Sequence, residues 1–119
     1  MGNKTILIYG LSPMQLLQLA ALAEPLDITC RAVPDSRAAY KVDELLAGAE
    51  IPGMPAMHLL GRFALLDGFH GQESLATALI NQVAPGVIKA VHTAHNGKWR
   101  FCDLCAEIST EHRTLTSRG

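Results

Sequence analysis

Two cysteines and two histidines near the C-terminus form the group of side chains with the clearest chemistry. Cys102 and Cys105 are three positions apart, and His92 and His95 precede them, so that all four fall within fourteen residues. Thiolates and imidazoles are common ligands of tetrahedral zinc, and cysteines with this spacing also form redox centres. A metal or redox protein that uses these four residues, with zinc as its cofactor, is therefore one hypothesis for this chain.

The surroundings of the same residues also fit a structural role. On a strand, His92 and His95 would face opposite sides, because their separation is odd. Cys105 shares the apolar stripe of the expected C-terminal helix with Leu104 and Ile108. In redox proteins the first cysteine opens the helix after a strand, whereas this helix begins before the cysteines. Because buried free cysteine behaves as a small apolar side chain, we expect no cofactor and keep zinc as the alternative.

A second candidate site consists of Lys89, Thr93, Asn96 and Trp99. Positions 89 and 93 face the same side of a strand, and an ammonium, a hydroxyl and an indole together can bind an anionic or planar ligand. The same sequence also predicts that Asn96 and the glycine after it form a turn that caps the last helix, and that Trp99 anchors this helix. The turn interpretation is favoured for Asn96 and Trp99, and a small-ligand sensor remains an alternative function.

The elements that position these residues follow from the apolar spacing of the chain. The spacing predicts helices over 13–23, 38–48, 71–83 and 98–111, and strands over 5–9, 27–33, 62–66 and 87–93. The segment 34–61 has no assigned role, and is either an ordered crossover or a mobile flap.

The predicted elements repeat. A shift of 58 residues places Gly10 on Gly68 and the helix cap Ser12 on His70, and two further positions place Ile28 on Ile88. The pseudo-repeat halves are 5–33 and 62–93, and each reads as strand, glycine turn, capped helix and strand.

The repeat predicts the fold. Two tandem βαβ units plus a C-terminal helix predict an α/β (α+β) protein, a ferredoxin-like sandwich, with the two first strands paired at its centre. Right-handed crossovers place both main helices on one face of the sheet. The C-terminal helix, the segment 38–48 or a partner chain must then cover the other face. A truncated doubly wound parallel sheet is the alternative.

Composition limits the classes of function. The 119 residues fit a single domain, 1–119. A net charge of −1 argues against nucleic-acid binding, and no apolar run is long enough to span a membrane. Three cysteines and the lack of a leader predict a cytoplasmic protein without disulfides. Only 18% of the residues are charged, below the usual quarter, so we expect an apolar face buried in a homodimer or against a protein partner.

Residues 64–112 resemble a family of small bacterial proteins, the domain of unknown function 3783. The resemblance is carried by the Lys-Ala-Val-x-Thr pattern that begins at Lys89, by Asn96 and Trp99, and by the closing Glu111 and His112. It supports the fold and implies no reaction. Since no catalytic triad, paired-carboxylate or nucleotide motif is present, the leading hypothesis is a non-enzymatic interaction or regulatory module.

Overall fold

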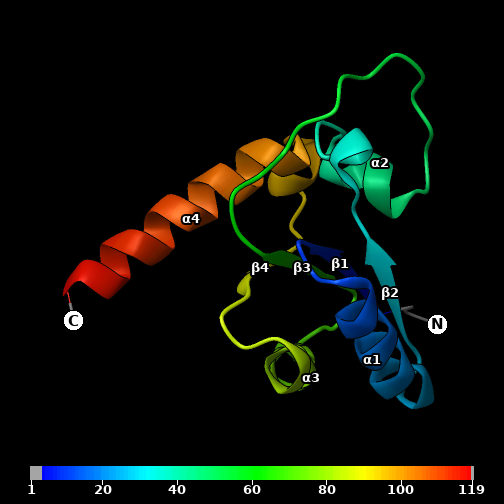
Figure 1. Ribbon diagram of the computed structural model, residues 1–119, viewed down its shortest axis with the longest axis vertical. Coiled ribbons are helices and arrows are strands. Elements are labelled where there is room, and N and C mark those ends of the chain that lie inside the picture. Colours follow the sequence, from blue (N-terminus) through cyan, green and yellow to red (C-terminus); the bar gives the residue numbers. More distant parts are fainter. Residues whose placement is uncertain (1–3, 119) are drawn as a thin grey trace.

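The structure is a computed structural model that describes residues 4–118, and the side chains of residues 4–112. Its centre is a four-stranded sheet in the order β2-β1-β3-β4, seen between two helical layers in Figure 1. The strands are β1 (Lys4–Tyr9), β2 (Ile28–Ala32), β3 (Phe63–Asp67) and β4 (Ile88–Val91). The prediction of an α+β fold is confirmed.

The two first strands pair at the centre of the sheet. β1 and β3 run antiparallel, with Ile6 opposite Leu66 and Ile8 opposite Ala64. β2 lies parallel to β1 on one side, and β4 lies parallel to β3 on the other. The expected pairing of two strand–helix–strand units is therefore present.

The ferredoxin-like arrangement of the strands is not confirmed. In that sandwich each unit is a split βαβ unit, whose two strands are separated by a strand of the other unit. Here β1 and β2 are direct neighbours, as are β3 and β4. The parallel pairs and the antiparallel centre also exclude a purely parallel sheet.

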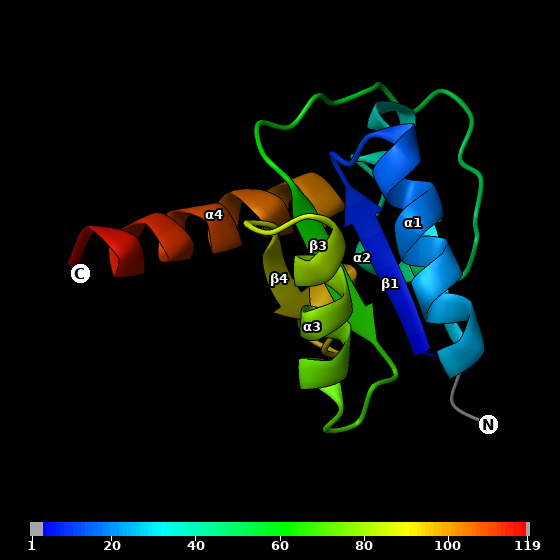
Figure 2. The same ribbon diagram turned by 60° about the horizontal axis from the view of Figure 1, so that its bottom comes forward.

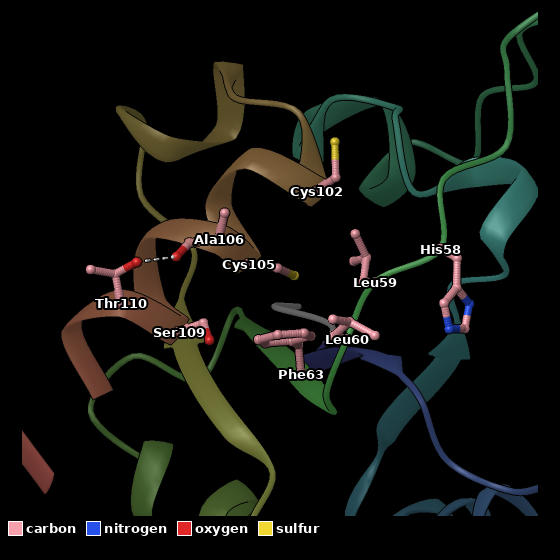
Figure 3. Close-up of a pocket in the computed structure, with 9 residues that line it drawn as sticks. All are labelled: His58, Leu59, Leu60, Phe63, Cys102, Cys105, Ala106, Ser109 and Thr110. Carbon is pink, nitrogen blue, oxygen red and sulfur yellow. Dashed lines mark hydrogen bonds between the residues drawn. The ribbon is translucent and has the colours of Figure 1, made fainter. Parts of the chain in front are cut away.

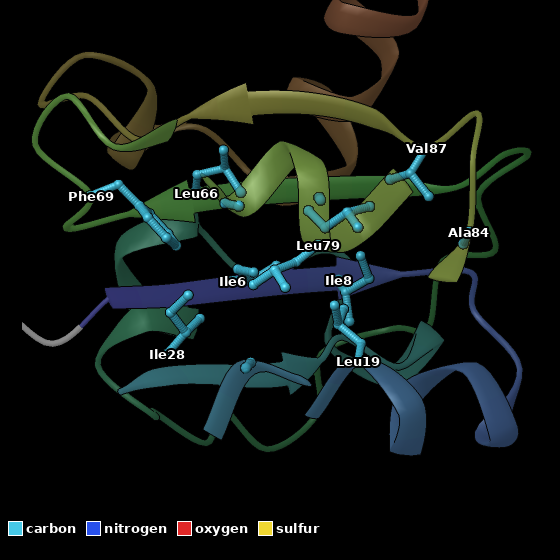
Figure 4. Close-up of a cluster of buried hydrophobic side chains, with 13 residues drawn as sticks. Ile6, Ile8, Leu19, Ile28, Leu66, Phe69, Leu79, Ala84 and Val87 are labelled. Carbon is cyan, nitrogen blue, oxygen red and sulfur yellow. The ribbon is translucent and has the colours of Figure 1, made fainter. Parts of the chain in front are cut away.

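Helices α1 (Pro13–Ala23) and α3 (Glu73–Val83) lie together on one face of the sheet (Figure 2). Between them and the strands is one hydrophobic cluster, in which Leu19 of α1 and Ile80 of α3 contact the sheet. Ile6, Ile8 and Leu66 supply its strand side (Figure 4). Successive strand residues point to opposite faces of the sheet. The strand residues that alternate with Ile6, Ile8 and Leu66 must therefore pack on the face away from α1 and α3.

The other face is covered by α2 (Val42–Leu46) and α4 (Phe101–Arg118). Leu7 and Leu65 of the sheet pack there against Val42, Phe101 and other residues of a second hydrophobic cluster. Both chain segments proposed as covers therefore lie on this face. Helices therefore cover the middle of both sheet faces, whereas residues of the edge strands, such as Arg31 of β2 and Val91 of β4, stay exposed.

Three short 3₁₀ helices complete the described chain, at Glu24–Leu26, Asp35–Arg37 and Asn96–Lys98. The last of these explains why α4 begins at Phe101 and not near residue 98. None of the helices in the described part of the chain combines the length and apolar character needed to cross a membrane.

The two halves differ in detail from the predicted alignment. Ser12 caps α1 as expected, with reciprocal bonds to Gln15 of 3.1 and 3.2 Å. His70 is not a cap: it lies in the turn before α3 with φ of 48°, and α3 starts after Gln72 without a side-chain cap. Moreover, Ile28 corresponds to Val87, since both join the α1–α3 cluster and Ile88 packs on the opposite face.

Candidate functional site

The structure separates the four residues of the predicted ligand site. The Lys89 ammonium donates to the Asn81 side chain and to the Val87 carbonyl, both at 2.8 Å, and partial burial lowers its pKa. Lys89 therefore contacts α3, whereas Trp99 packs at the border of the cluster between the sheet, α2 and α4.

Thr93 and Asn96 do meet, as partners in one turn. The Thr93 amide donates to the Asn96 side-chain carbonyl oxygen at 2.8 Å, and the Asn96 amide donates to the Thr93 hydroxyl at 3.0 Å. The Asn96 side chain also donates to the Val91 carbonyl at 3.0 Å. These bonds occupy the polar groups that the ligand hypothesis needs, and the expected turn is present. Asn96 does not cap the last helix, because its side chain bonds to Thr93 and Val91 while α4 begins only at Phe101.

The four predicted metal or redox residues also have separate surroundings. Cys105 is 2% exposed in the α4 core, and Cys102 is buried beside it. The rings of His95 and Trp99 pack edge to face with centroids 5.6 Å apart, and His92 lies between two carboxylates. In the described part of the chain, no three His, Cys, Asp or Glu side chains are placed to hold a metal ion.

Burial also disfavours thiol chemistry. Desolvation raises the pKa of Cys105 far above that of a free thiol, and raises the pKa of Cys102, with the Asp103 charge as a second cause. It raises the pKa of Cys30 to about 11. Because the thiolate is the reactive and metal-binding form, these cysteines are poorly suited to redox or metal chemistry.

Two histidine–carboxylate clusters that sequence reasoning missed lie at the carboxyl ends of the strand pairs. In the first, the Tyr9 hydroxyl at the end of β1 donates to Asp35 Oδ1 at 2.5 Å. His58 Nδ1 lies 3.0 Å from Asp35 Oδ2, and the Leu59 amide donates to the Tyr9 hydroxyl at 2.8 Å. The cluster thus joins β1, the segment after β2, and the segment before β3.

The hydrogen bonds of this cluster shift two pKa values. The bonds from Tyr9 and His58 lower the pKa of Asp35. Burial, followed by the bond to Asp35, raises the pKa of Tyr9. Tyr9 therefore stays a protonated donor and Asp35 an ionised acceptor at neutral pH.

The second cluster lies at the end of β3 and β4. His92 Nδ1 is 2.9 Å from Asp67 Oδ1, and His92 Nε2 is 2.9 Å from Asp43 Oδ1 of α2. Gly97 packs directly against this bridge, where a Cβ atom would overlap Asp43 Oδ1. The bridge joins α2 to the sheet, and its two carboxylates are on different sides of the imidazole.

One signal for these clusters is present in the sequence. Tyr9 and Asp67 are related by the 58-residue shift, and each precedes the glycine of its turn. Of the remaining partners, His92 lies in the second repeat half, whereas Asp35, His58 and Asp43 come from segments outside the repeat elements, so spacing alone does not identify the clusters.

Two hollows adjoin the segment His58–Gly61. One is a groove of about 290 Å³ between this segment and α4, where Leu60 and Phe63 lie opposite Cys105 (Figure 3). The other is a crevice of about 430 Å³ at the first strand end, lined by the Tyr9, Asp35 and His58 cluster and by apolar side chains.

The outer surface of α1 has a different character. The helix contains no charged residue, and Met14 and Leu17 are 66% and 69% exposed. Gln18 and Ala21 are exposed as well. We call these four residues, which recur at helical spacing along one side, the α1 face.

Comparison with known proteins assigns no activity. No curated protein and no solved structure matches the chain. The model of one family, described as Domain of unknown function (DUF3783), matches residues 62–115. This range runs from the start of β3 into α4 and overlaps the residues that carry the resemblance in the sequence. The second half of the chain therefore matches this family, whose description names no reaction.

Proposed function

We propose that this chain is a non-enzymatic interaction module that pairs with a second copy of itself through the α1 face. The observation that carries the proposal is an exposed helix side with two large apolar side chains and no charge: Met14 and Leu17 project outward from α1. Burying a leucine or methionine side chain contributes about 1.5–3 kcal/mol, so the contact has a source of free energy.

The absence of charge favours a second copy as the partner. In a two-fold symmetric dimer the same patch meets itself, so a charged patch would bring like charges together. The α1 face avoids this repulsion, and the small side chain of Ala21 lets two helices approach closely. Homodimer interfaces are also more apolar than ordinary surface.

The neighbouring helix extends this neutral surface. α3 contacts α1 and has Glu73 as its one charged residue. Its exposed positions are small or amide side chains, among them Ser74, Ala78 and Gln82. Ser74 and Gln82 can form part of the polar rim around an apolar centre at Met14 and Leu17, the usual anatomy of an interface.

Sedimentation equilibrium of the full chain tests the proposal. We expect a reversible dimer, and we expect Leu17→Glu to weaken it at least about 100-fold, because two leucines are lost and two carboxylates would be desolvated. Glutamate is a good helix former, so α1 itself should persist.

Leu60→Glu is the matched control. Leu60 is 87% exposed, and it borders the groove beside α4 rather than the α1 face. The dimer should survive this change. A wild-type monomer at every concentration, or a dimer that Leu60→Glu breaks and Leu17→Glu leaves intact, would refute pairing through α1.

A further inference from the structure

We infer that the crevice at the carboxyl ends of β1 and β2 binds a small neutral molecule with a cis diol, the chemistry of a nucleoside ribose. The site is distinct from the α1 face and extends beyond the proposed pairing. Its volume of about 430 Å³ falls within the range of small-molecule sites, about 300–1,000 Å³. Ligands of open α/β sheets bind outside the carboxyl ends of parallel strands, which is where this crevice lies.

The lining combines apolar walls with a few converging polar groups, as small-molecule sites do. Leu11 and Val33 lie on the side of the strand ends, and Leu60 on the side of the segment before β3. The polar groups are those of the Tyr9, Asp35 and His58 cluster. An apolar or planar part of a ligand can rest on the aliphatic side chains while its polar part reaches the cluster.

Asp35 is prepared to accept two hydroxyl donors. Oδ1 accepts from Tyr9 and Oδ2 contacts His58, and each carboxylate oxygen can accept a further bond. The side chain is 47% exposed, so these positions are accessible. Two hydroxyls on adjacent ring carbons can donate to the two oxygens, and such bonds to an ionised group are stronger than neutral ones.

His58 offers a third contact to the same ligand. Its Nδ1 faces Asp35, which fixes the ring, and its Nε2 has no hydrogen-bond partner within the described residues. Leu59 holds the Tyr9 hydroxyl through its amide, so Tyr9 is a positioning residue and the free polar atoms belong to Asp35 and His58.

Charge favours a neutral ligand. No lysine or arginine lines the crevice within the described part of the chain, and the ionised Asp35 carboxylate would repel phosphate or carboxylate groups. A diol has no charge to be repelled and presents two donors to an acceptor pair.

The second strand end shows that such a space is not inherent in the fold. There Asp67 occupies the position of Tyr9, and His92, Asp43 and Gly97 pack together around it. The equivalent end in the first half contains a crevice instead. At the boundary of this crevice Gly61 packs closely on Gly10, and a Cβ atom added to Gly10 would lie only 2.7 Å from the Gly61 carbonyl oxygen.

Amide NMR shifts of the full chain, with adenosine and 2′-deoxyadenosine as probes, test the inference. Adenosine should move the amide signals of Gly10, Asp35 and Leu59 in a saturable manner. The deoxy probe, which lacks one hydroxyl of the diol, should bind about tenfold or more weakly. If adenosine leaves these signals unmoved, or if both probes bind equally, the inference is wrong.

Asp35→Asn should weaken adenosine binding at least about tenfold, because an amide supplies one acceptor and no charge. Asp27→Asn is the matched control: Asp27 is exposed before β2, and its φ of 58° suits asparagine. Unchanged binding by Asp35→Asn contradicts the inference. Should that substitution disturb the neighbouring segment, the two probes on the unaltered chain still decide.

Discussion

The two halves of this chain share a path and differ in the surfaces that they present. Each is a strand, a helix of eleven residues and a parallel strand. The first half has an uncharged, outward-facing apolar helix and an open strand end. The second half has a helix with amide and small side chains outward and a strand end closed by a histidine between two carboxylates.

The comparison distinguishes the buried positions, which the fold constrains, from the helix surfaces and strand ends, which the fold does not constrain. Both halves contribute equally buried residues to the shared cluster, for example Ile28 and Val87, each 4% exposed. Packing density constrains such positions, whereas helix surfaces and strand ends tolerate change. Both proposed contacts, with a second copy and with a diol, therefore use the first half, whose free positions are apolar or open.

The largest effect should come from filling the closed strand end. In Gly97→Ala the new Cβ would overlap Asp43 Oδ1 and would lie 2.7 Å from His92 Nε2, so the bridge must open. We expect a loss of about 2–3 kcal/mol in the free energy of unfolding, measured by urea denaturation, as for other overpacked sites.

Gly53→Ala separates crowding from backbone strain. Gly53 has a φ of 79°, and a Cβ atom added there would have nothing within 4 Å. Its cost should therefore be only that of a left-handed residue, about 1 kcal/mol. Equal losses in the two variants would show that the bridge is not tightly packed, and would remove the contrast between the closed and open ends.

A smaller effect should distinguish the two helix starts. Ser12→Ala removes the reciprocal cap of α1 and should cost about 1 kcal/mol. Gln72→Ala, at the start of α3, removes no side-chain cap and should be nearly neutral in the same denaturation experiment. Equal costs would contradict the unequal capping of the repeats.

Much of the architecture was predictable because apolar spacing reports burial. Ile6, Leu7 and Ile8 are apolar in succession, and the strand that contains them is covered on both faces. Gly10 and its counterpart Gly68 marked equivalent turns, and both have positive φ. These signals are local and occur in both halves. They revealed the repeat, and the repeat predicted that the first strands of the two halves pair.

The order of the strands and the clusters could not be predicted in the same way. Whether β2 pairs with β1 directly depends on neighbours that no local pattern encodes. Likewise, Asp35 meets His58 only because the segment before β3 returns to the end of β1. Cys102 and Cys105, which suggested a metal or redox site, are buried. They lie at core positions of the helix, because a free cysteine packs as a small apolar side chain in the same way as a leucine.

The smallest effect concerns acid stability at the open strand end. The pKa of Asp35 is lowered in the folded chain by its bonds from Tyr9 and His58, so its stabilising contribution is present above the ordinary aspartate pKa of about 3.9. That contribution is lost as pH falls below this value through the lowered folded pKa. Asp35→Asn should therefore lower the melting temperature at pH 6, and this difference from wild type should shrink between about pH 4 and pH 2. Asp27→Asn, which removes an exposed carboxylate at the other end of β2, should show no such convergence. A difference for Asp35→Asn that stays constant with pH would mean that its bonds do not discriminate between the charged and neutral carboxyl, and that the open strand end is held by packing alone.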